Sequence, residues 1–166
     1  SPTYTNAGTY TVYYQVTKTG YQTVTGSKTI TITKANGSVT LSKTSESLTY
    51  PNTTTFSVTK NTSNGTLSCT SSNTSIATCS GSGTTITVTA GTTPGVATIT
   101  VTSASTTNYN SASATYSATV ASGLLSVTAN GYTGEYDGSA HGITVTSSGA
   151  TIKYGTTSGT YNLSSS

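Results

Sequence analysis

Apolar and polar residues alternate along most of this chain with a period of two, the pattern of strands that bury one face. In residues 9–17, Tyr10, Val12, Tyr14 and Val16 would share one face, and mostly polar residues the other. The alternation recurs roughly every eight to twelve residues, as in two-layer β folds. Further strands are predicted at 28–34, 38–42, 54–59, 65–70, 75–80, 84–90, 95–103, 113–120, 124–129, 142–147 and 150–156.

Turn signals separate these stretches. The motifs SNG, GSG, TTPG and YDG lie between predicted strands, and glycine, proline, asparagine and aspartate favour tight reversals of the chain. No stretch keeps a helical period over two turns. The sequence therefore predicts an all-β fold of the sandwich type.

Composition supports strands over disorder. The 166 residues include 44 threonines and 28 serines, only 5% are charged, and 12 tyrosines supply nearly all aromatic side chains. A chain poor in charge and leucine could be disordered. Threonine, valine, isoleucine and tyrosine nevertheless fit a half-buried pleated surface, which favours β-structure over a mucin-like stalk. The length allows one large domain or two small ones.

Charge and hydropathy exclude some partners. The net charge of +3 comes from six lysines scattered along the chain, so no basic stripe for nucleic acid is expected. No run approaches the roughly 18 apolar residues of a membrane span. No signal peptide is recognised, so we expect either a cytosolic chain or, preferably, a segment of a longer secreted protein.

The two cysteines favour the secreted interpretation. Cys69 and Cys79 each lie at the end of a short β-like run, with SSNTS between them as a turn. A hairpin would place them opposite one another, at a separation suited to a disulfide. A metal or redox pair would need closer spacing or further ligands. We therefore predict a structural disulfide and an oxidising, extracellular compartment.

The middle of the chain resembles a known family. The stretches SSNTSIATC (71–79) and AGTTPGVATITVT (90–102) are similar to the bacterial immunoglobulin-like group 2 repeats. Cys79 stands where that family usually has valine. The resemblance implies an immunoglobulin-like β-sandwich over residues 36–121.

The flanks resemble a different family. The motif GYTGEYDGSAHGITVT (131–146) is similar to the opening half of the mostly bacterial, MBG-type immunoglobulin-like surface repeats, and NAGTYTVYYQV (6–16) to the closing half. The two halves occupy residues 122–166 and 1–35, in reversed order. The resemblance implies one split module, completed by an adjoining copy.

Such a split leaves strands that need partners. A two- or three-stranded remnant exposes sheet edges and apolar faces to water. We therefore expect Tyr161 and Leu163 to meet Tyr10, Val12 and Tyr14. The partners could belong to the next copy in a tandem array, to a separate chain, or to the same chain folded back on itself. The first two arrangements are open, heterologous series of contacts and predict a fibre.

The only histidine, His141, follows Asp137 in EYDGSAHG. A hydrolase triad would also need a nucleophile at a strained turn, and no GxSxG motif is present. A local turn is the preferred interpretation. The three carboxylates are too few and too scattered for a calcium site or a glycosidase pair, so no metal, cofactor or enzymatic activity is expected.

An internal isopeptide bond is a further candidate. It needs a buried lysine, an asparagine or aspartate, and a catalytic carboxylate. The available sets are Glu135 or Asp137 with Lys153 or Lys28, and Glu46 with Lys43 or Lys60. Solvated lysines on strand faces are the preferred interpretation.

The sequence as a whole predicts a structural repeat unit of a bacterial extracellular filament or surface stalk. Adjoining copies of the same chain are the expected partners. Short linkers would hold successive modules end to end with little freedom. The alternative is an adhesin whose exposed tyrosine and threonine faces bind glycans or host proteins.

Overall fold

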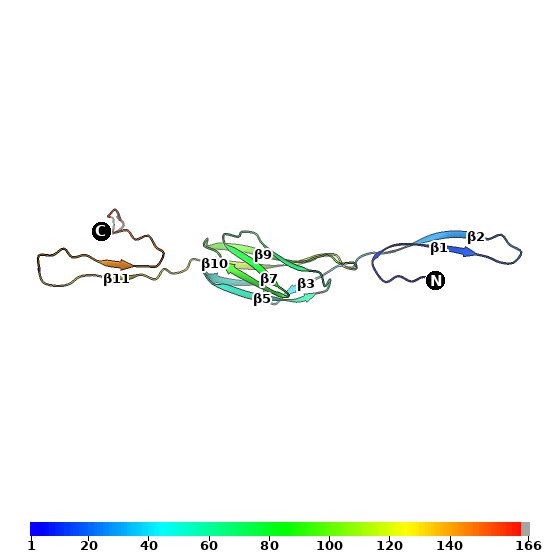
Figure 1. Ribbon diagram of the computed structural model, residues 1–166, viewed down its shortest axis with the longest axis horizontal. Helices are drawn as coiled ribbons and strands as arrows, with labels where there is room; N and C mark the ends of the chain where they lie inside the picture. The colour runs from blue at the N-terminus through cyan, green and yellow to red at the C-terminus, as the bar shows by residue number, and fades with distance from the viewer. Residues whose placement is uncertain (164–166) are drawn as a thin grey trace. The chain divides into compact units, whose positions relative to one another are not determined.

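The computed structural model describes residues 1–163, and regular secondary structure within them consists of β-strands (Figure 1). The all-β prediction is confirmed. Nearly all strand pairs are antiparallel. In chain order the strands are β1 (Gly8–Val16), β2 (Val24–Ile32), β3 (Val39–Leu41), β4 (Ser45–Thr49), β5 (Thr53–Asn61), β6 (Leu67–Ser71), β7 (Ala77–Ser82), β8 (Thr85–Ala90), β9 (Gly95–Ser103), β10 (Ala112–Ala121), β11 (Thr128–Asn130) and β12 (Thr144–Thr146).

The chain divides into two compact units, residues 1–122 and 123–166. The first unit holds the β1–β2 hairpin, called the arm below, and the eight strands β3 to β10, called the core domain. The second unit holds the β11–β12 hairpin. The last three residues of the predicted MBG-type half, 164–166, lie outside the described part of the chain. Within that part, no helix is long and apolar enough to cross a membrane.

The core domain consists of two four-stranded sheets. One has the strand order β4-β10-β9-β6, and the other β3-β5-β8-β7. Antiparallel pairing prevails, but β4 runs parallel to β10, with Ser45 opposite Ser117 and Thr49 opposite Ala121. The contacts between β6 and β7, and between β3 and β10, link the two sheets along their sides.

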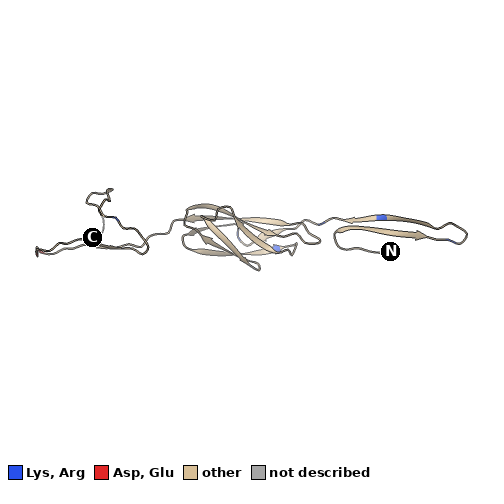
Figure 2. Cartoon of the chain, turned by 45° about the horizontal axis from the view of Figure 1, so that its top comes forward, with Lys and Arg blue, Asp and Glu red and all other residues tan. Residues whose placement is uncertain are grey.

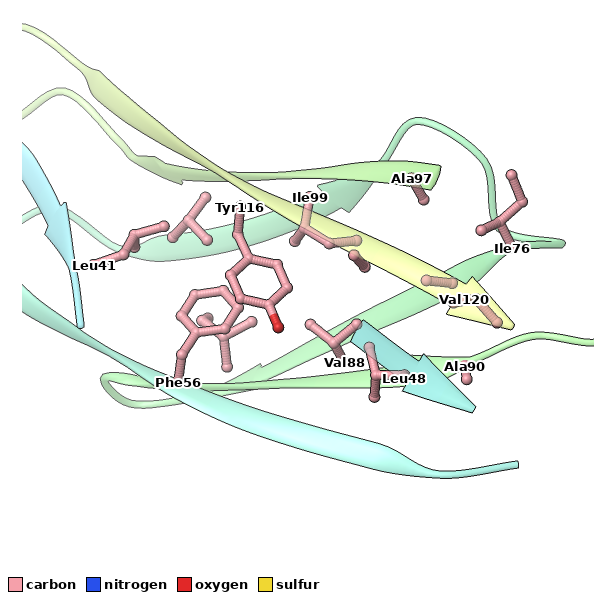
Figure 3. Packing of buried hydrophobic residues seen from close by; sticks show 14 of the residues in the cluster. Leu41, Leu48, Phe56, Ile76, Val88, Ala90, Ala97, Ile99, Tyr116 and Val120 are labelled. Atoms are coloured by element: carbon pink, nitrogen blue, oxygen red, sulfur yellow. The ribbon is translucent and has the colours of Figure 1, made fainter. Parts of the chain in front are cut away.

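One apolar cluster fills the space between these sheets (Figure 3). Alternation along β8 and β9 places every second side chain inward, so Ile86, Val88, Ile99 and Val101 are fully buried. The rings of Phe56 and Tyr116 stack with centroids 4.4 Å apart. The remaining buried apolar residues are Leu41, Leu48, Val58, Ile76, Ala77, Ala90, Ala97, Ala118 and Val120.

A small polar cluster closes one end of the core domain. The buried hydroxyls of Ser63 and Ser103 lie 2.6 Å apart, and both are within 3.0 Å of the side-chain oxygen of Asn61, so one hydroxyl donates to the other and the second donates to Asn61. The Asn61 amide in turn donates to the Gly65 carbonyl over 3.0 Å. A side chain at Gly65 would collide with the carbonyl of Ala104, so only glycine fits this approach. These hydrogen bonds satisfy groups that burial would otherwise destabilise.

The sequence did not predict β4. Its alternation places Glu46 and Leu48 inward, so only one apolar residue marks the buried face. A five-residue edge strand with a carboxylate on that face has almost no period-two signal. Its position follows from parallel pairing with β10, a contact distant in sequence.

The second unit forms less strand than expected. The strands predicted at 124–129 and 142–147 shrink to three residues each, and 150–156 contributes one antiparallel bridge, from Tyr154 to Leu163. Neither strand of this unit has a fully buried residue, because none of the described residues of the unit forms a second layer on the hairpin. The bridge to Tyr154 gives the Leu163 backbone a partner inside its own unit.

Candidate interaction surfaces

The arm carries an apolar face that is largely exposed. In the β1–β2 register, Tyr10 lies opposite Ile30, Tyr14 opposite Gly26 and Val16 opposite Val24. Because side chains alternate between the faces of a strand pair, one face collects most of the apolar residues, with Lys28 opposite Val12, and the other collects threonines and serines together with Tyr13 and Gln15. We call the apolar residues of the first face the arm face: Tyr10, Val12, Tyr14, Val16, Val24, Ile30 and Ile32.

Exposure of the arm face rises toward the tip of the hairpin. Tyr10, Val12 and Ile32 are half-buried, whereas Val16 is 59% exposed and Val24 58% exposed. Aliphatic side chains left in water on a two-stranded ribbon are unfavourable, and such ribbons are rarely stable alone. The arm face is therefore a candidate surface for packing against another layer.

Tyrosine rings order the arm face. Tyr10 stacks on Tyr4 with ring centroids 4.0 Å apart, and its hydroxyl donates to the Asn6 carbonyl over 3.0 Å. Tyr14 lies across Gly26, where any side chain would meet its ring. The glycine thus makes room for the ring, which replaces the missing side chain in the cross-strand pair. A hollow of about 460 Å³ lies here, lined by Tyr13, Tyr14, Gln15, Thr25, Gly26 and Ser27.

The second unit also exposes apolar side chains. Tyr161 is 60% exposed and Leu163 49% exposed, although the Leu163 backbone pairs with Tyr154. These are the two residues of this unit for which the sequence predicts an inter-copy contact. Other large side chains exposed in this unit are Leu124, Leu125, Val127, Tyr132, Tyr136 and Ile143.

The arm joins the core domain through Asn108. The Asn108 side-chain oxygen accepts from the Ala7 amide over 2.7 Å, and its amide donates to the Asn6 side chain over 3.0 Å. The Asn108 carbonyl accepts from the Ala35 amide over 2.8 Å. One residue thus holds both chain segments at the base of the arm. Beside it lies a hollow of about 300 Å³, lined by Thr5, Ala7, Ile32, Thr33, Ala35, Asn108 and Tyr109.

Charged residues are sparse (Figure 2). The segments that flank the core domain carry net charges of opposite sign. Residues 1–35 contain three lysines and no carboxylate residue, a formal charge of +3. Residues 123–166 contain Glu135, Asp137 and Lys153, a formal charge of −1. The arm and the second unit are therefore electrostatically complementary, although weakly so.

Glu46 stands at the centre of the main charged cluster. Its carboxylate accepts from the Thr54 hydroxyl over 2.7 Å, from the Lys43 ammonium over 3.0 Å and from the Tyr116 hydroxyl over 3.4 Å. The Thr54 hydrogen bond, with that of Lys43, holds the pKa of Glu46 below its usual value. Burial and the nearby carboxylate raise the pKa of Tyr116 to about 12.

Lys43 and Glu46 form an ordinary ion pair, with 3.0 Å between the ammonium and the carboxylate. An isopeptide bond needs an amine that is buried and neutral. The Lys43 side chain is 47% exposed and pairs with the carboxylate. Lys43 is therefore a partly solvated lysine, as the sequence interpretation preferred for this set of residues.

Asp137 and His141 form a local turn. The Asp137 carboxylate accepts from the Ser139 amide over 2.8 Å and lies 2.8 Å from a His141 ring nitrogen. The hydrogen bond from the Ser139 amide lowers the pKa of Asp137 most, and the contact with His141 lowers it further. The imidazole stacks on Tyr132, with ring centroids 3.6 Å apart. These contacts orient the turn, and both side chains are partly exposed to solvent.

Cys69 and Cys79 form a disulfide, as predicted, with Cα atoms 6.2 Å apart. The expected hairpin between them is wrong. Cys69 belongs to β6, the edge of one sheet, and Cys79 to β7, the edge of the other. The bond therefore ties the two sheets together along one side of the core domain.

Comparison with known proteins finds limited similarity. No protein-family model and no curated relative matches the chain. Among solved structures, domains 4 and 5 of the S-layer protein SbsC are 26% identical over 66% of this chain and 65% of that one, with a TM-score of 0.41. Domains 1–6 of the same protein are 26% identical over 74% of this chain and 18% of that one, with a TM-score of 0.42. The chain thus spans just under two thirds of the first structure and less than a fifth of the second. At these TM-scores the likeness assigns neither fold family nor function.

Proposed function

We propose that this chain is a structural repeat unit of a bacterial extracellular filament or surface stalk, in which copies join head to tail. The core domain is an immunoglobulin-like β-sandwich of the group 2 type. Residues 122–166 and 1–35 are the two halves of an MBG-type module. The halves of neighbouring copies complete each other.

The observation that carries this proposal is the largely exposed arm face. The core domain buries its own apolar cluster, and the buried side-chain polar atoms among its described residues all have hydrogen-bond partners. The arm instead has a mostly apolar face, in which Tyr4 covers Tyr10 near the base while Val16 and Val24 near the tip stay exposed. A chain that folds one part completely and leaves another half-covered is suited to assembly through the latter.

The second unit of an adjoining copy is the proposed occupant. It is likewise a single layer with exposed apolar side chains, including Tyr161 and Leu163. Its formal charge is opposite in sign to that of the arm. In the completed module, Tyr161 and Leu163 pack beside Tyr10, Val12 and Tyr14. Leu163 keeps its bridge to Tyr154, so the packing involves side chains or the other strand edge.

Energetics favour copies joined in one chain. Fully burying one valine, isoleucine or leucine side chain contributes roughly 1.5–3 kcal/mol. Association of separate molecules loses about 4–15 kcal/mol in translational and rotational freedom. Covalent linkage of copies largely removes this loss, because the second partner is then held at high effective concentration. A tandem array therefore completes the module most readily, although separate chains also can.

A two-copy fusion tests the proposal, with residue 166 of the first copy joined to residue 1 of the second. Amides of β1 and β2 in the second copy should exchange with deuterium more slowly than in a single copy. Ile30→Ser, on the arm face, should abolish that difference, whereas Thr29→Ser, on the opposite face, should preserve it. Equal exchange in the fusion and the single copy would refute head-to-tail completion.

A glycan-binding adhesin is the second candidate. The hollow beside Tyr13 and Gln15 combines an exposed aromatic ring with amide and hydroxyl groups, the usual chemistry of sugar contacts. Saturation-transfer NMR against a panel of neutral oligosaccharides tests it. Binding that Tyr13→Ala removes would favour the adhesin, because Tyr13 lies outside the arm face.

A further inference from the structure

Two segments of the first unit run side by side in the same direction. The segment that leads from the arm into the core domain contacts the segment that leads toward Ser122. Ala35 forms a parallel bridge with Tyr109, and the Ala35 carbonyl accepts from the Asn110 amide over 2.8 Å. Further along, β4 pairs in parallel with β10. Parallel pairing occurs only here among the described strands and bridges.

The chain enters and leaves the core domain at opposite ends of β10. Ala35 lies beside the residues that precede β10, whereas Ser122 directly follows its last residue. The ten residues of β10 span about 33 Å at the usual rise of a strand. Tension applied to the two chain ends first loads the Ala35 bridge and the pairing of β3 with β5, because β3 lies between Ala35 and β4. Once these contacts yield, the tension acts along β10 and draws β4 toward its own N-terminus and β10 toward its C-terminus.

We propose that the parallel contact between β4 and β10 is the mechanical clamp of the molecule. Under end-to-end tension the two strands are pulled in opposite directions along their length. All hydrogen bonds of the ladder are then loaded together, in shear, and must break nearly at once. This inference rests on the proposed structural role and specifies the element that would bear its load.

Backbone hydrogen bonds mark the two ends of the clamp. The Ser117 amide donates to the Thr44 carbonyl over 2.8 Å, and the Tyr50 amide donates to the Ala121 carbonyl over 3.0 Å. Between them, Leu48 and Val120 are paired and buried in the core cluster. Sliding β4 along β10 would thus break the ladder and move Leu48 out of the core.

The arm and the disulfide lie outside this clamp. The first and last residues of the arm, Gly8 and Ile32, lie opposite each other, so tension opens the hairpin from its base one bond at a time. The disulfide joins β6 and β7, and the clamp strand β4 is at the other edge of its sheet. Cys69 and Cys79 therefore limit how far the unfolded chain extends and leave the rupture force to β4 and β10.

Pulling in two directions tests the clamp in the wild-type fold. The full chain is stretched by optical tweezers, first between its termini and then between Thr92→Cys and the C-terminus. Thr92 is exposed and lies near the end of β9 that faces Ser122, so the second direction unzips the antiparallel β9–β10 pair. Rupture force should be several-fold higher between the termini. Equal forces, or a higher force in the second direction, would overturn the proposal.

Reduction of the disulfide supplies a second readout. Stretched between the termini, the reduced chain should extend further by about 30 Å, because ten residues between the cysteines are released at about 3.5 Å each, less their Cα separation. The rupture force should stay the same. A lower force after reduction would place the load on β6 and β7 and contradict the clamp.

These measurements use single molecules and do not depend on assembly between copies. If the rupture force is high between the termini but the two-copy fusion shows no slower exchange, the clamp stands and head-to-tail completion is refuted. If the fusion shows slower exchange but the rupture force is equal in both directions, head-to-tail completion stands and the clamp is refuted.

Discussion

The hydroxyl of Tyr116 donates a hydrogen bond to the carboxylate of Glu46 across 3.4 Å, and so links β10 to the neighbouring edge strand β4. The Tyr116 side chain is fully buried and also stacks on Phe56 of the opposite sheet. One ring thus connects the apolar core with the charged cluster. Both ends of the hydrogen bond titrate, so stability should depend on pH at two extremes.

In acid, Glu46 should lower the stability of the core domain. The folded state depresses its pKa below 4.5, so its contribution is full above that value and is lost as the pH falls through the folded pKa. Glu46→Gln should be less stable than wild type at neutral pH but should lose less on acidification. Urea unfolding at a series of pH values, followed through β10 amides, measures this. Parallel stability curves for the two proteins would contradict it.

In alkali, Tyr116 should have the corresponding effect. Its pKa rises from 10.0 to about 12 on folding, so its contribution is full below pH 10 and is lost as the pH rises toward 12. Tyr116→Phe should remove this part of the alkaline loss, whereas Tyr13→Phe, at an exposed ring, should leave it unchanged. The midpoint of urea unfolding between pH 9 and about 12 provides the measurement.

Removing the disulfide should destabilise the core domain. Closing a loop of ten residues contributes roughly 2–3 kcal/mol in the entropic treatment. The double variant Cys69→Ala, Cys79→Ala should therefore unfold at lower urea by about that free energy. Reducing agent should lower the wild-type midpoint similarly and leave the variant unchanged. A variant as stable as the oxidised wild type would show that the link between β6 and β7 is dispensable.

Two valines on β9 provide a matched test of the core. Val101 is fully buried, whereas Val96 is 58% exposed on the same strand. Val101→Ala should cost about 2–3 kcal/mol, from lost apolar burial and the cavity left behind. Val96→Ala should change the free energy of unfolding by less than about 0.5 kcal/mol. Equal effects would mean that the position of β9 in the sheet is wrong.

Asn108 should govern how firmly the arm is attached. Asn108→Ala removes the acceptor of the Ala7 amide and the donor to Asn6. Deuterium exchange at the Ala7 amide should become faster, while amides of β9 stay protected. Asn108→Asp keeps an acceptor for Ala7 and should preserve most of that protection. Unchanged exchange in Asn108→Ala would show that other contacts hold the arm.

Much of the local structure could be predicted from the sequence. Alternation in 95–103 coincides with β9, and the faces assigned to Tyr10, Val12 and Tyr14 are those of the β1–β2 register. Such features depend on nearest neighbours and on the fixed period of a strand. The disulfide was also predicted, but from a hairpin between Cys69 and Cys79 that the fold does not contain.

Other features depend on partners distant in the chain. The strand predicted at 150–156 shrinks to a bridge at Tyr154, since its alternation finds no second layer to pack against. The arm face was predictable from alternation, yet its attachment through Asn108 was not, because an asparagine in a loop gives no sign of which amides it will meet.

The sequence by itself determined that this chain forms strands, which side of each is apolar and that its cysteines pair. The tertiary structure alone decided that β4 lies parallel to β10, where the Tyr116 hydroxyl reaches Glu46. It also decided that the disulfide joins two sheets instead of the two strands of one hairpin. The physical reason is that alternation specifies a face but no partner. Strand pairing is chosen by the burial and hydrogen bonding of the whole domain.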